Sequence, residues 1–112
     1  MSDILEQLTA ILEQRKRADD SQSYVASLHR KGINKILEKL GEEAVETVLA
    51  AKDCEQDASD SKRLEVVKET ADLWFHSMVM LSHLDLEARQ VLEELEKRFN
   101  ISGLVEKASR TN

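Results

Sequence analysis

The sequence predicts an all-α protein. No proline occurs among its 112 residues and only three glycines do, so the chain has few helix breakers. Aromatic residues make up 4% of the sequence, which leaves little of the usual strand-forming material. A chain of this length is expected to fold as one domain, over residues 1–112.

Hydrophobic periodicity indicates where the helices lie. Five are expected, at about residues 3–17, 24–31, 33–52, 62–83 and 86–99. Gly32 ends the second helix in the manner of a left-handed C-terminal cap, and Asp85 can cap the fifth. Residues 53–61 are polar and are expected to form a connector, and residues 100–112 a short tail. Antiparallel helices with short loops predict a helical bundle.

The apolar residues predict which helix faces are buried. The fourth helix is apolar on nearly every side, so it is expected to be central and covered by several neighbours. The third helix is expected to bury Ile33, Ile36, Leu37, Leu40, Ala44 and Val48. The fifth is expected to turn inward Leu86, Val91, Leu92, Leu95 and Phe99.

Composition excludes several classes of function. The net charge of −6 argues against a general nucleic-acid binder, although divalent cations can bridge an acidic protein to a phosphate substrate. Cys54 is the single cysteine, which excludes an internal disulfide and a thiolate zinc site and indicates an incidental thiol. The first residues do not resemble a signal peptide, and the apolar run 73–81 is too short to span a bilayer. A soluble, cytoplasmic protein is expected.

Charged residues form a strip along the third helix. At about 100° per residue, one side of this helix carries Lys35, Lys39, Glu42, Glu43 and Glu46. Taken alone, this strip is explained by a solvated helix face. The fourth helix changes that interpretation.

The fourth helix carries acidic residues between its apolar flanks. Glu69 and Asp72 share a narrow stripe there with Glu65, His76 and His83. Buried carboxylates cost several kcal/mol each unless they are paired or bind a metal. The stripe is therefore expected to face the acidic strip of the third helix around a divalent cation.

The spacing of these carboxylates suggests the ligands. Glu43 and Glu46 are i, i+3 neighbours, as are Glu69 and Asp72, so each pair lies side by side on its helix. Four carboxylates favour a hard ion, Mg²⁺ or Mn²⁺. A di-iron site is disfavoured because its usual Glu-x-x-His spacing does not occur here. Gly41 indicates either close helix packing or room for a substrate beside the acidic strip.

The acidic residues also match a known pattern. On the third helix they have the form E-E-x-x-E (Glu42, Glu43, Glu46), and on the fourth E-x-x-D (Glu69, Asp72). This pattern resembles the all-α nucleotide pyrophosphohydrolase superfamily, which includes MazG and the dimeric dUTPases. The resemblance implies a MazG-like helical bundle with four to five helices per chain.

The surrounding residues narrow the resemblance. Matching segments follow one another along most of the chain: Ser23–Leu28, Lys31-Gly32, Lys39–Glu43, Ala50–Lys52, Glu69–Leu73, His76 and Val91–Arg98. They resemble the phosphoribosyl-ATP pyrophosphohydrolase family, which performs the second step of histidine biosynthesis. The pair Trp74-Phe75 departs from the usual family residues and leaves the acidic pattern untouched.

The resemblance implies a reaction and its partners. Phosphoribosyl-ATP is cut between its α and β phosphates, giving phosphoribosyl-AMP and pyrophosphate. Mg²⁺ is the implied cofactor, with Mn²⁺ as a substitute. A homodimer is also implied, in which helices of both chains complete the bundle. Neither a nucleic acid nor a membrane is expected as a partner.

The resemblance also assigns roles to the acidic residues and to the cations near them. Glu43, Glu46, Glu69 and Asp72 are the implied metal ligands. Glu42, Glu43 and Glu46 are the candidate catalytic residues. Glu42 either orients the attacking water or binds a second Mg²⁺.

Cations and histidines complete the candidate site. Lys35 and Lys39 are expected to contact phosphates, although a surface ion pair with a nearby glutamate also explains each of them. Weaker phosphate candidates, suggested by the family segments alone, are Lys31, Lys52 and Arg98. His76 lies on the acidic stripe, where it either supports the ligands or is a hydrogen-bonded core residue. His29 and His83 are expected to be structural or exposed.

Two other functions stay open at this point. A housecleaning dNTP or NTP pyrophosphohydrolase would use the same metal site. A non-catalytic helical interaction domain would need no metal, but it gives no reason for carboxylates on an otherwise apolar helix. The residues alone support the hard-metal site, whereas the substrate comes from the resemblance.

Overall fold

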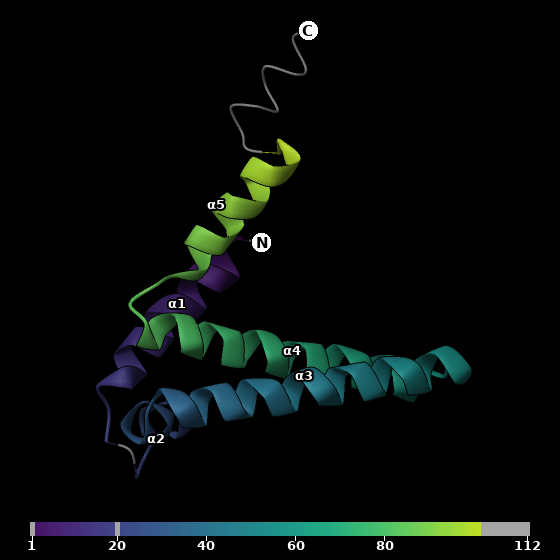
Figure 1. The fold of residues 1–112 in the computed structure, drawn as a ribbon, viewed down its shortest axis with the longest axis horizontal. Coiled ribbons are helices and arrows are strands. Elements are labelled where there is room, and N and C mark those ends of the chain that lie inside the picture. The colour runs from purple at the N-terminus through teal and green to yellow at the C-terminus, as the bar shows by residue number, and fades with distance from the viewer. Residues whose placement is uncertain (1, 20, 102–112) are drawn as a thin grey trace, which may run out of the picture.

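Two long antiparallel helices form the centre of the protein (Figure 1). The computed structural model describes residues 2–19 and 21–101, so most of the expected tail lies outside the described residues. These residues form five helices and no strand, which confirms the all-α prediction. The helices are α1 (Ser2–Lys16), α2 (Tyr24–Lys31), α3 (Ile33–Gln56), α4 (Asp60–His83) and α5 (Ala88–Phe99).

The helices α3 and α4 pack against each other along much of their length, and the other three gather at one end of this hairpin. The helix α2 packs on α1 and α3, and α1 also contacts α4 and α5. The helix α5 extends away from the hairpin (Figure 1). Among the described residues, no helix is both long and apolar enough to cross a membrane.

Two expected helix boundaries were wrong. The helix α3 continues to Gln56, so the connector spans only residues 57–59 instead of 53–61. Polar side chains on a solvent-facing last turn do not interrupt a helix, and Ser59 ends the connector by capping α4. At the other boundary Asp85 adopts a left-handed φ of 59°, whereas an N-cap needs an extended backbone. Glu87 is the N-cap of α5 instead, and its N–H donates to the Gln90 side chain at 2.8 Å.

The hydrophobic core lies where α1 and α2 meet the hairpin. Its buried side chains come from all five helices: Leu12, Val25, Leu28, Ile36, Met78, Val79 and Ala88. Burial of each large aliphatic side chain stabilises the fold by roughly 1.5–3 kcal/mol. Lys16 of α1 reinforces this end by donating to the Ser82 carbonyl at 2.7 Å.

Several residues of α3, α4 and α5 that the sequence predicts to be buried are exposed in the single chain. Val67 and Trp74 of α4 are 63% and 61% exposed, so this helix is not covered on all sides. On α3 the expected core residues Leu37 and Val48 are exposed as well. Exposed large side chains on and before α5 are Leu86, Val91, Leu95 and Phe99. The physical reason is that α1, α2 and α5 gather at one end and leave much of the hairpin uncovered.

Candidate metal and phosphate site

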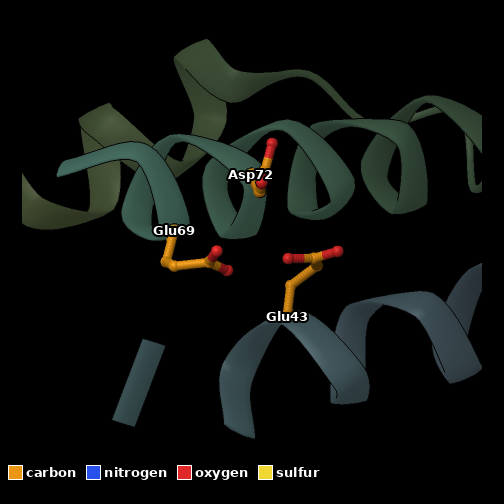
Figure 2. A group of neighbouring side chains, drawn as sticks. All are labelled: Glu43, Glu69 and Asp72. Atoms are coloured by element: carbon orange, nitrogen blue, oxygen red, sulfur yellow. The ribbon is translucent and has the colours of Figure 1, made fainter. Parts of the chain in front are cut away.

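Three carboxylates meet between the two long helices. Glu43 of α3 extends toward Glu69 of α4, and Asp72 lies one turn further along α4 (Figure 2). One carboxylate oxygen from each residue lies within 4.8 Å of the other two. Glu43 is only 9% exposed, although it is charged at neutral pH in its ordinary state. We call these three residues the carboxylate cluster.

A hydroxyl group fixes the two helices beside the cluster. The Oγ1 atom of Thr47 lies 2.7 Å from the carbonyl oxygen of Glu43 and 3.2 Å from that of Glu69. The hydroxyl therefore links the backbones that carry two of the three carboxylates. Nothing in the sequence pattern distinguished Thr47 from the other hydroxyl residues of these helices.

Thr47→Val is expected to lower the free energy of unfolding by about 1 kcal/mol, because it removes a partly buried hydrogen bond between helices. Urea denaturation of the metal-free protein measures the change. Thr70→Val is the matched control, since the Thr70 hydroxyl bonds only to Val66 within its own helix, at 2.7 Å. Equal destabilisation by the two substitutions would contradict the bridging role of Thr47.

Two members of the carboxylate cluster, Glu43 and Glu69, hold protons more tightly than isolated carboxylates do. Burial raises the pKa of Glu69 to about 7, helped by a hydrogen bond with Glu46 and by the charges of Glu46 and Glu43. Burial also raises the pKa of Glu43, as do the charges of Glu46 and Asp72. The Oε2 atoms of Glu43 and Glu69 are buried, and among the described residues neither has a hydrogen-bond partner. Such oxygens are the donors that a hard divalent cation prefers.

Glu46 stands at the edge of this arrangement. Its side chain is exposed, and it lies outside the group of three whose oxygens meet. It is nevertheless close enough to hydrogen bond with Glu43 and Glu69. The structure thus brings three of the four expected ligands together and places the fourth beside them.

The raised pKa of Glu69 predicts a pH-dependent stability. A carboxyl group whose pKa is higher in the folded state than its ordinary value of 4.5 destabilises the fold progressively as the pH rises through about 7. In EDTA, Glu69→Gln is therefore expected to raise the melting temperature at pH 8 and to change it little at pH 4.5. Thermal melts across this range measure the difference. A variant that melts below the wild type at pH 8 would contradict the raised pKa.

Two lysines flank the cluster on α3. Lys39 donates to Glu42 at 2.9 Å, which raises the pKa of Lys39 and lowers that of Glu42. Lys35 is 3.5 Å from Glu38. Both lysines thus pair with a glutamate at i, i+3, in the way a surface ion pair does, and both stand within two turns or so of Glu43.

The three weaker phosphate candidates lie toward the C-terminal ends of three different helices. Lys31 is exposed in the last turn of α2. Lys52 is exposed on α3, roughly 9 Å along the helix beyond Glu46 at 1.5 Å per residue. Arg98 bonds to Glu94 at 2.9 Å on α5, which leads away from the hairpin. The single chain does not bring Arg98 to the cluster.

His76 connects the cluster to a residue that the sequence interpretation did not assign to the site. Its ring is buried, and its Nδ1 lies 2.8 Å from the Asp72 carbonyl oxygen. Since a carbonyl only accepts, Nδ1 carries the proton, and Nε2 accepts from the Tyr24 hydroxyl at 3.0 Å. Tyr24 was visible in the sequence only as part of the Ser23–Leu28 segment. His76 thus holds Tyr24 next to the cluster.

The contacts of His29 and His83 point to a role in helix packing. His29 and His83 join α2 to α4 through their Nδ1 atoms, which are 2.9 Å apart, and their rings stack. Cys54 is partly buried near the end of α3. A Cβ atom added at Gly41 would meet nothing within 4 Å, so close packing inside the chain does not explain this glycine.

Comparison with known protein families identifies the class of enzyme. The model of the phosphoribosyl-ATP pyrophosphohydrolase family matches residues 5–99, which include all the described helices except the first few residues of α1. The chain belongs to this family. Its members are hydrolases of histidine biosynthesis that act as phosphoribosyl-ATP diphosphatases.

Proposed function

We propose that the carboxylate cluster, together with Glu46, holds Mg²⁺ during hydrolysis of phosphoribosyl-ATP between its α and β phosphates. The observation that carries the proposal is that oxygens of Glu43, Glu69 and Asp72 meet within 4.8 Å. Glu43 and Glu69 each also have a buried oxygen with no hydrogen-bond partner in the described part of the chain. The donors are all oxygens, which suits Mg²⁺, or Mn²⁺ in its place. A bound divalent ion neutralises phosphate charge and polarises the phosphorus–oxygen bonds.

The surrounding residues bind the substrate and handle the proton. Lys39 and Lys35 contact phosphate oxygens once their pairing with Glu42 and Glu38 is exchanged for the substrate. Water forms the new phosphorus–oxygen bond while the bond to the bridging oxygen breaks and pyrophosphate leaves. Glu42, an exposed carboxylate next to Glu43 in the sequence, orients this water and accepts its proton.

We further propose that two copies of the chain associate through the uncovered hairpin. The exposed apolar residues on its two helices are Leu37, Val45, Val48, Leu49, Leu64, Val67 and Trp74. Large apolar patches are rarely left in water by a soluble protein. Pairing of two hairpins gives a bundle that covers these residues, as the family resemblance implies.

Pyrophosphate release from phosphoribosyl-ATP tests the proposed function. Release is expected with Mg²⁺ and is expected to disappear in EDTA. Deoxynucleoside triphosphates are measured in parallel, and faster release from them would show that the substrate is wrong. Absence of both Mg²⁺ binding and hydrolysis would instead favour a non-catalytic interaction domain.

A further inference from the structure

An aromatic cavity lies between α1, α2 and α4, and Tyr24 of its lining is joined through His76 to the backbone of Asp72. Its volume is about 490 Å³, and its lining consists of Arg15, Ala18, Gln22, Ser23, Tyr24, Val25 and Phe75. The lining combines two aromatic rings with a cation and with an amide that both donates and accepts hydrogen bonds. We call it the aromatic cavity.

The two rings of the cavity form one surface. Tyr24 and Phe75 are nearly parallel, with ring centres 6.3 Å apart and planes inclined by 22°. Tyr24 is 50% exposed although its hydroxyl is held, so part of its ring stays open to solvent. The ring of His76 packs edge-on against both and fixes them.

Several contacts tie the cavity to the cluster. The Tyr24 hydroxyl bonds to His76, and His76 bonds to the backbone of Asp72. Burial raises the pKa of the Tyr24 hydroxyl, and the charges that act on it are those of Lys39, Glu43, Lys35 and Glu42. The phosphate-binding edge of the site and the aromatic cavity therefore meet at one residue.

We propose that the aromatic cavity binds the nucleoside part of the nucleotide whose phosphates lie at the cluster, with the base against Tyr24 and Phe75. Bases bind to open aromatic rings by stacking. Arg15 adds a charge suited to the ribosyl phosphate that the substrate carries in addition to its triphosphate. This subsite rests on the proposed function, since a substrate without a base would not need it.

Two measurements test the subsite. The KM for phosphoribosyl-ATP is compared with the dissociation constant of Mg²⁺-tripolyphosphate, which has no base. Tyr24→Leu and Phe75→Leu are expected to raise KM about tenfold or more, as loss of a stacking ring does, and to leave tripolyphosphate binding unchanged. Tyr24→Phe keeps the ring and is expected to lose far less than Tyr24→Leu. Phe99→Leu, an exposed aromatic at the end of α5, is the control and is expected to change neither quantity.

Specific outcomes overturn the subsite. Equal losses in Tyr24→Phe and Tyr24→Leu would mean that the hydroxyl matters and the ring does not. Equal weakening of tripolyphosphate binding and of KM would mean that Tyr24 only supports the cluster.

Titration with AMP separates this inference from the proposed function. AMP is expected to bind the wild type and to bind Tyr24→Leu and Phe75→Leu more weakly, whether or not phosphoribosyl-ATP is hydrolysed. If the wild type binds AMP but releases no pyrophosphate, the subsite is supported and the proposed function is contradicted. If the enzyme is active but all variants bind AMP with the same affinity, only the subsite proposal is contradicted.

Discussion

Asp72→Asn and Glu43→Gln are each expected to reduce Mg²⁺-dependent pyrophosphate release by roughly three orders of magnitude, while the protein stays folded. Each substitution keeps the size of the side chain and removes one of the three charges that meet in the cluster. Glu46→Gln is expected to act in the same direction through its contacts with Glu43 and Glu69. A steady-state assay of pyrophosphate release measures the loss, and circular dichroism checks the helix content.

Glu93→Gln is the matched control, because this carboxylate is exposed on α5, where it pairs with Arg89. Its activity is expected to equal that of the wild type. Near-normal turnover in Asp72→Asn or Glu43→Gln would contradict the proposal that these carboxylates bind Mg²⁺. Calorimetric titration with Mg²⁺ provides a second readout, and both variants are expected to lose binding.

Leu64→Lys is expected to convert the proposed homodimer to a monomer. The side chain lies on the exposed apolar side of α4, and a buried lysine without a partner costs several kcal/mol per chain. Sedimentation at several protein concentrations measures the mass, and the melting temperature of the wild type is expected to rise with concentration. Position 64 is more than a helical turn from Glu69, so the substitution does not change the proposed Mg²⁺ ligands directly.

Ile4→Lys serves as the control for added charge, because Ile4 is also exposed (65% against 52% for Leu64) and lies in the first turn of α1. It is expected to leave the dimer intact. A wild type that sediments as a monomer at every concentration would remove the proposed association. A dimer that survives Leu64→Lys and dissociates in Ile4→Lys would move the interface from the hairpin to α1.

Local signals carried most of the fold prediction. The expected bounds of α2, about residues 24–31, agree with the structure, and Gly32 at its end has the positive φ of 99° that favours glycine. The wrong boundaries were those predicted from residue types alone, without knowledge of the backbone geometry. The polar residues before Gln56 were predicted to be a connector, but polar residues also occur on the solvent-facing last turn of a helix. Asp85 was predicted to be a cap, but its left-handed φ cannot be deduced from the residue type.

The sequence predicts only those parts of the site that have a local signal. Carboxylates on an apolar helix are a strong signal, and Glu43, Glu69 and Asp72 do meet. Contacts between side chains far apart in the sequence leave no comparable signal. Tyr24 reaches His76 across 52 positions, and Thr47 reaches the Glu69 carbonyl across 22, so neither residue could be placed in the site from its spacing.

The short connector at residues 57–59 has a consequence for folding kinetics. The entropic cost of closing a loop is low when the pairing segments are adjacent in the chain. The α3–α4 hairpin is therefore expected to form early, and its formation brings Glu43 and Glu69 close together. Repulsion between these carboxylates opposes that step, and a divalent ion bound as proposed would relieve it. Refolding of the protein is thus expected to depend on the same ion that its chemistry is proposed to use.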